Sequence, residues 1–76
     1  MAELLAYLTR QLVDKPDAVR VETEEREDAI VLHLHVDRED IGKVIGRQGR
    51  IARALRAIVR ASATRDRRRV LLEIVE

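Results

Sequence analysis

The apolar residues near the N-terminus recur about every four positions, and this spacing predicts a helix over residues 3–13. Its apolar stripe consists of Leu4, Leu8 and Leu12, with Leu5 beside it. Pro16 ends the helix, because proline lacks the backbone N–H that the next turn requires. The chain therefore begins with one amphipathic helix whose apolar side must be covered.

From residue 19 the apolar residues alternate with polar ones, which is the pattern of half-buried β-strands. Strands are predicted over residues 19–24 and 30–36, joined by a charged hairpin turn at residues 24–28. One face of the second strand carries Ile30, Leu32, Leu34 and Val36, and the other carries Val31, His33 and His35. The first of these faces is the expected core face.

The period becomes helical again after Asp37, whose side chain is suited to cap a helix N-terminus. A short helix is expected before the glycines at residues 46–49. The longer helix from Arg50 carries an apolar stripe of Ile51, Leu55, Ile58 and Val59. A polar connection at residues 64–68 leads to a last strand over residues 69–75. The order α-β-β-α-α-β predicts an α+β fold, with one antiparallel three-stranded sheet and helices packed on one face.

Length and composition exclude several classes of protein. Seventy-six residues make one domain, 1–76, with little room for an enclosed active site. The absence of cysteine excludes disulfides, thiolate nucleophiles and cysteine-bound metals. No apolar run reaches the ~18–20 residues that cross a bilayer, and the first residues lack the basic segment of a signal peptide. We therefore expect a cytoplasmic protein that does not bind membranes.

The charges are unevenly distributed along a chain whose net charge is only +1. Residues 1–42 hold five basic and eleven acidic side chains, whereas residues 43–69 hold ten basic side chains and one acid, Asp66. A concentrated basic segment favours an anionic partner, most directly the phosphates of a nucleic acid. Arginines on a solvated helix face would give the same distribution, so charge alone leaves both interpretations open.

All three glycines fall within eight residues, at Gly42, Gly46 and Gly49. Two of them bracket the joint between the predicted helices, where a glycine backbone can turn sharply and approach another backbone closely. The free N–H groups at the start of the second helix would point at an anion in this joint, and Lys43, Arg47 and Arg50 add positive charge around it. The spacing fits neither the P-loop nor the dinucleotide fingerprint.

Residues 41–51, with the sequence IGKVIGRQGRI, resemble the core of a KH domain, whose GXXG loop clamps about four nucleotides of a single strand. Two predicted strands precede the loop and one follows it, which is similar to the type II arrangement. The whole chain resembles the KhpA family of small bacterial KH proteins. The resemblance implies a single type II KH domain with its GXXG loop at residues 46–49. It also implies a protein that clamps single-stranded RNA, as an RNA chaperone or post-transcriptional regulator.

The resemblance implies an RNA-binding set in and beside the loop: Lys43, Ile45, Gly46, Arg47, Gln48, Gly49, Arg50, Ile51 and Arg53. The two loop glycines would carry the sugar-phosphate backbone, and the two residues between them would contact it. The two isoleucines, with part of the second strand, would form an apolar groove for the bases. No cofactor or catalytic residue is implied.

A single KH domain holds few nucleotides, so a second site on a partner would strengthen binding. The family resemblance implies two such partners, a second copy of the chain and a larger KH protein of the KhpB (Jag) type. An alternative function follows, in which the protein is mainly an interaction subunit and its partner supplies most of the RNA affinity. Preference for single-stranded DNA also stays open, because no residue identifiably recognises the 2′-hydroxyl.

Other features have simpler interpretations. Arg56 and Arg60, together with Arg53, fit a solvated helix face, with secondary phosphate contacts as the alternative, and the arginines at residues 67–69 fit a charged turn. His33 and His35 share a strand face, but two histidines without a third ligand do not indicate a metal site. Val31, Leu71 and Val75 could form a contact surface for another protein or be scattered apolar residues of the outer sheet face. No catalytic constellation can be assembled, so we do not expect an enzyme.

Overall fold

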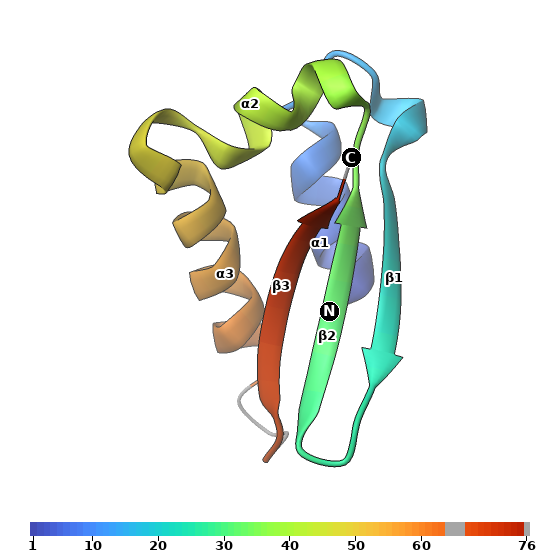
Figure 1. Cartoon of the computed structure of the whole chain (residues 1–76), viewed down its shortest axis with the longest axis vertical. Coiled ribbons are helices and arrows are strands. Elements are labelled where there is room, and N and C mark those ends of the chain that lie inside the picture. The colour runs from blue at the N-terminus through green and yellow to red at the C-terminus, as the bar shows by residue number, and fades with distance from the viewer. Residues whose placement is uncertain (64–66, 76) are drawn as a thin grey trace.

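In the described part of the chain, one three-stranded sheet and three α-helices make up the fold (Figure 1). The structure is a computed structural model, and it describes residues 1–63 and 67–75. The helices and strands are α1 (Ala2–Arg10), β1 (Arg20–Glu25), β2 (Ala29–His35), α2 (Ile41–Ile45), α3 (Arg50–Ser62) and β3 (Arg69–Val75). Short 3-10 helices span Pro16–Ala18, Arg38–Asp40 and Arg47–Gly49. The predicted element order and α+β class are confirmed, and residues 64–66 of the predicted connection lie outside the described residues.

The strands lie in the order β1-β2-β3, with β2 in the centre of the sheet. β1 and β2 are antiparallel neighbours joined by a hairpin, and Thr23 lies opposite Leu32. β3 runs parallel to β2, with Leu72 opposite Leu32. The prediction of an all-antiparallel sheet is therefore wrong for β3. The cause is that α2 and α3 form a crossover, which returns the chain to the end of the sheet where β2 began.

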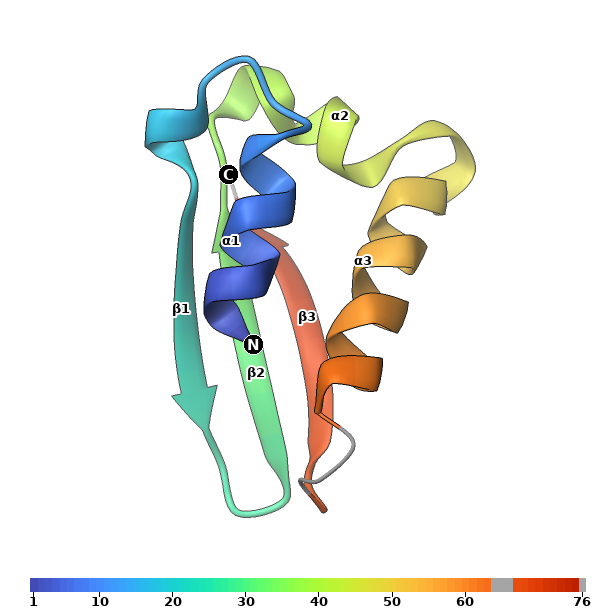
Figure 2. The ribbon, with the colours of Figure 1, turned by 180° about the vertical axis from the view of Figure 1, so that it is seen from behind.

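The helices pack on one side of the sheet, as the two opposite views in Figures 1 and 2 show. α1 lies across the back of the sheet, α3 lies beside β3, and α2 spans the end of the sheet between them. The core fills the space between these layers. Its fully enclosed side chains include Leu5 from α1, Leu32 and Leu34 from β2, and Val44 from α2. The predicted core face of β2 is confirmed.

The N-terminal helix differs from its prediction in length and in the residues that it buries. It ends at Arg10, because the N–H groups of Gln11 and Leu12 bond the carbonyls three residues back rather than four. Leu5 and Thr9 are the fully buried positions, and the Thr9 hydroxyl donates to the Leu5 carbonyl at 2.7 Å. Leu4 and Leu12, predicted to face the core, are 40% and 38% exposed.

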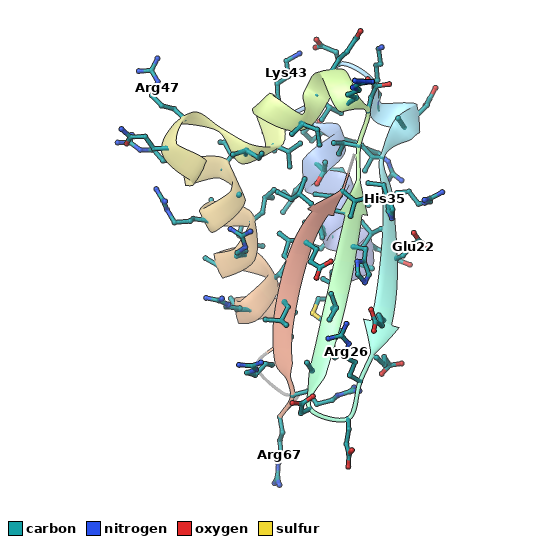
Figure 3. The ribbon with its side chains drawn as sticks, viewed as in Figure 1. Glu22, Arg26, His35, Lys43, Arg47 and Arg67 are labelled. Atoms are coloured by element: carbon teal, nitrogen blue, oxygen red, sulfur yellow. The ribbon has the colours of Figure 1, made fainter. Side chains whose placement is uncertain are left out.

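The outer face of the sheet is polar at its centre. His33 lies between two carboxylates, with its Nε2 3.0 Å from Glu24 and its Nδ1 3.2 Å from Glu73. His35 Nε2 is 2.6 Å from Glu22, on the next strand (Figure 3). The apolar residues considered for a contact surface are not freely exposed there: Val31 is buried, and Leu71 and Val75 are half-buried. Within residues 1–63 and 67–75, no three His, Asp or Glu side chains are grouped to hold a metal ion.

No helix in the described ranges is both long enough and apolar enough to span a membrane.

Candidate nucleic-acid interface

The joint between α2 and α3 is a tight loop in which three of four consecutive residues have a positive φ. These are Gly46 (φ 76°), Gln48 (φ 57°) and Gly49 (φ 75°). The Gly46 N–H donates to the Gly42 carbonyl at 2.9 Å, which closes α2, and the Gly49 N–H donates to the Gly46 carbonyl at 3.2 Å. The chain thereby reverses within four residues, and the side chains of Arg47 and Gln48 are left exposed at its tip.

Gly46 and Gly49 are required for different reasons. A Cβ on Gly46 would lie 2.4 Å from Ile51 Cγ1 and 2.9 Å from the Ile51 backbone nitrogen, so only glycine fits. A Cβ on Gly49 would meet only the Arg53 guanidinium, at 3.6 Å, and there the positive φ alone favours glycine. Ile51 thus supports the loop from beneath, while Ile45 is 39% exposed beside it.

Helix α3 starts at this loop, and no acidic side chain offsets the positive end of its dipole. It has no acidic residue in its first turn, and its N-cap, Gly49, has no side chain to bond the first N–H groups. The Arg50 N–H bonds the Arg47 carbonyl, and the positive end of this 13-residue helix is directed at the loop. This is an arrangement that binds phosphate oxygens.

The arginines from residue 47 onward are largely without acidic partners. In the described ranges, no ion pair is formed by Arg47, Arg50, Arg53, Arg56, Arg60, Arg67 or Arg69. Arg47 projects away from the body of the molecule at the loop, and Arg67 projects away at the opposite end (Figure 3). Arg56 is half-buried and the other six are exposed. Among the described residues, these seven arginines therefore carry positive charge that no acidic side chain pairs with.

Lys43 differs from these arginines. Its ammonium bonds the carboxylate of Asp14 and lies 3.5 Å from Oδ1 of Asp40. The hydrogen bond to Asp14 is the main reason why the pKa of Lys43 is raised. Of the cations predicted to surround the loop, Lys43 is thus already neutralised within the protein, whereas Arg47, Arg50 and Arg53 are not.

The strand that contacts α3 is β3, whereas the family resemblance implied a groove beside the second strand. The second strand, β2, is central, and β3 is the edge strand that packs against α3. The parallel crossover causes this, because it inserts β3 between β2 and α3. α3 therefore packs against β3, and the groove expected beside the second strand stays a prediction.

The sequence reasoning also missed a buried carboxylate next to the site. Asp40 is only 1% exposed and accepts two backbone N–H groups from residues 14 and 15. No periodicity marks this role, because the partners lie about 25 residues away along the chain.

Comparison with known proteins agrees with this geometry. A family model described as the KH domain of KhpA and KhpB matches residues 2–74. The chain belongs to this family. A relative from Clostridium perfringens is 47% identical over 75 residues, which cover 99% of this chain and 100% of the relative. Relatives from Treponema pallidum (50% identity, 97% and 92% of the two chains) and Aquifex aeolicus (46% identity, 100% and 96%) are similar. All three relatives carry the name RNA-binding protein KhpA.

A second surface feature lies on the side of α3 that faces α1. It is an apolar groove of about 260 Å³ lined by Leu8, Gln11, Leu12, Ile51, Ala54, Leu55 and Ile58. Ile58, predicted as part of the buried stripe of α3, is 39% exposed in this groove. Half-buried Leu8 of α1, exposed Leu12 just beyond the end of α1 and exposed Ile58 of α3 thus line one apolar groove.

Proposed function

We propose that this KH protein binds single-stranded RNA through the GXXG loop at residues 46–49, without catalysing a reaction. The observation that carries the proposal is the tight glycine loop at the uncapped start of α3, surrounded by arginines that lack acidic partners. Membership of a family whose relatives are named RNA-binding proteins supports it. As the sequence predicted, the single domain 1–76 would act in the cytoplasm, as an RNA chaperone or post-transcriptional regulator.

The proposed contacts follow the geometry of the loop. A phosphate lies over the loop beside Gly49, where a Cβ would meet only the Arg53 guanidinium, and it faces the positive N-terminal end of α3. Arg47 and Gln48 reach the sugar-phosphate backbone from the loop tip, and the unpaired guanidinium groups of Arg50 and Arg53 attract further phosphates. Exposed Ile45 offers an apolar contact for a base, and Ile51 supports the loop that carries these groups.

The test is a fluorescence-anisotropy titration with short single-stranded RNA at several salt concentrations. For three phosphate contacts, log affinity against log salt should have a slope of about −2, since each phosphate contributes about −0.7 in a single strand. The double variant Arg47→Asp/Gln48→Asp should lose binding. Arg10→Asp/Ala18→Asp is a charge-matched control, because it makes the same change in net charge at exposed positions outside the loop and outside the apolar groove.

Circular dichroism determines whether both double variants are folded. Equal binding by the wild type and the loop variant would contradict the proposal, as would a flat salt response. Single-stranded DNA of the same sequence, titrated in parallel, determines whether the 2′-hydroxyl contributes.

The apolar groove favours a second role, in pairing with another KH chain. We infer that it supports self-association or pairing with a KhpB-type protein, which would supply a second RNA site and raise the avidity of a small domain. Sedimentation of the wild type and of Ile58→Glu tests this, with exposed Ala57→Glu on the same helix as control. A tight wild-type dimer that binds RNA negligibly would favour the interaction-subunit alternative. A monomer at all concentrations would contradict self-association.

A further inference from the structure

One buried carboxylate, that of Asp40, joins the linker after α1 to the start of α2, although these segments are far apart in the sequence. Asp40, at the N-terminal end of α2, accepts the Asp14 N–H at 3.2 Å on Oδ1 and the Lys15 N–H at 3.0 Å on Oδ2. It thereby attaches the linker between α1 and β1 to the start of α2. Its side chain is 2% exposed, so water contributes little to satisfying its charge.

Side-chain ion pairs close the same junction. Lys43, on α2, bonds the Asp14 carboxylate and lies 3.5 Å from Asp40. In a second set of ion pairs the cation comes from the linker: the Lys15 ammonium lies 2.8 Å from Glu39 and 3.6 Å from Asp37, both just before α2. Each segment therefore contributes both a cation and an anion to the junction.

Burial and the neighbours of Asp40 shift its pKa in opposite directions. Burial raises this pKa, but the two backbone N–H donors and the Lys43 ammonium lower it by more, so the net shift is downward. The carboxylate is therefore ionised at neutral pH, and Lys43 supplies a compensating charge. If Lys43 turned toward a phosphate, Asp40 would lose its nearest cation.

The loop depends on α2 for its position. α2 has five residues, too few for a helix to be stable on its own hydrogen bonds, and it ends at Gly46, the first residue of the loop. Its place must come from tertiary contacts, which include the packing of α2 against α3, the buried Val44 and the Asp40 junction at its start.

We propose that Asp14, Asp40 and Lys43 form a strap that positions α2, and that Lys43 is a positioning residue rather than a phosphate ligand. The proposal rests on the proposed RNA binding of the loop. It assigns to Lys43 a role that its charge and its place two residues before Ile45 do not suggest. The exposed arginines at residues 47, 50 and 53 then supply the side-chain charge that meets the phosphates.

The Asp14→Asn variant separates the two roles of Lys43 sharply. If Lys43 is a phosphate ligand, this change removes a competing negative charge, so RNA should bind more tightly and with a steeper salt slope. If Lys43 belongs to the strap, the change loosens α2, so RNA should bind about two- to five-fold more weakly with the slope unchanged. The Asp14 side chain is 76% exposed, so its replacement by asparagine leaves the core intact.

The experiment measures RNA affinity at several salt concentrations for wild type, Asp14→Asn, Lys43→Gln and Arg47→Gln. Lys43→Gln should also weaken binding without changing the slope, whereas Arg47→Gln should reduce the slope by about 0.7. Asp17→Asn is the matched control, since Asp17 is an exposed acid of the same linker without an ion pair in the described ranges. Tighter or unchanged binding by Asp14→Asn would overturn the strap, and so would a slope for Lys43→Gln that falls as far as that of Arg47→Gln.

Amide hydrogen exchange keeps this proposal separable from the proposed function. The strap predicts faster exchange at residues 44–49 in Asp14→Asn than in wild type and Asp17→Asn, with or without RNA. If wild type fails to bind RNA, the proposed function fails, and this exchange still decides the strap. Unchanged exchange at residues 44–49 would overturn the strap.

Discussion

Alanine substitution of the three glycines should give three different changes in stability, although the glycines lie within eight residues. Gly46→Ala is expected to be the most destabilising, because its Cβ would lie 2.4 Å from Ile51 Cγ1 and 2.9 Å from the Ile51 nitrogen. The side chain of Ile51 can move by rotation, but its backbone nitrogen is fixed at the start of α3. Gly46 also has φ 76° and ψ 173°, a conformation that is nearly exclusive to glycine.

The magnitudes follow from these contacts. For Gly46→Ala, backbone strain costs about 1–3 kcal/mol and overpacking against Ile51 costs a similar amount, so the free energy of unfolding should fall by about 2–6 kcal/mol. Gly49→Ala needs a left-handed conformation (φ 75°, ψ 16°), but its Cβ would make only an ordinary contact with the Arg53 guanidinium, so it should cost about 1–2 kcal/mol. Gly42 lies within α2 with nothing near its Cβ, so alanine there should stabilise by about 0.5–1 kcal/mol.

Urea and thermal unfolding followed by circular dichroism measure this ranking. In a domain of this size, each kcal/mol shifts Tm by about 4–8 °C. Adding Ile51→Ala to Gly46→Ala removes the contact with Cγ1 but leaves the backbone contact, so it should relieve only part of the overpacking. Equal stabilities of Gly46→Ala and Gly49→Ala would refute the argument from close approach. A loss of stability in Gly42→Ala would refute the argument from helix propensity.

Two further predictions concern the core and the buried carboxylate. Leu32→Ala, at a position that is 0% exposed in the central strand, should lower the free energy of urea unfolding by about 2–5 kcal/mol without changing the sheet content by circular dichroism. The lowered pKa of Asp40 contributes stability that is complete above the unfolded-state pKa, about 4, and is lost as pH falls through the folded-state pKa. Wild type should therefore lose Tm between about pH 5 and pH 3 more steeply than Asp40→Asn, which should already be less stable at pH 7.

Residue spacing was sufficient to predict the elements but not the direction of the last strand. The alternation in β2 correctly placed Ile30, Leu32 and Leu34 in the core, because a period of two fixes which residues share a face. The same alternation in β3 is identical whichever way the strand runs. Its direction is determined by the α2–α3 crossover, which brings β3 back parallel to β2 beside α3.

Spacing also does not distinguish a residue of the core from one that lines a surface groove. Leu4 and Leu12 have the helical period of core residues, yet both are more than a third exposed, and Leu12 lines the groove between α1 and α3. The buried positions of α1 include Thr9, whose hydroxyl is satisfied by a backbone carbonyl of its own helix. A polar side chain with a local acceptor can thus occupy a core position that hydrophobicity alone assigns to leucine.

Lys43 and Arg47, the two cations that flank the start of the loop, differ in whether an acidic side chain of the fold already pairs with them. Lys43 and Arg47 are four residues apart, and the sequence predicted both as phosphate contacts. The linker after α1 brings Asp14 to Lys43, while no acid of the described residues reaches Arg47. The acidic N-terminal half of the chain therefore neutralises one of the cations counted in the basic half. Charge counts suggest four cations at the loop, and a slope near −3, but pairing leaves three, so we expect a slope near −2.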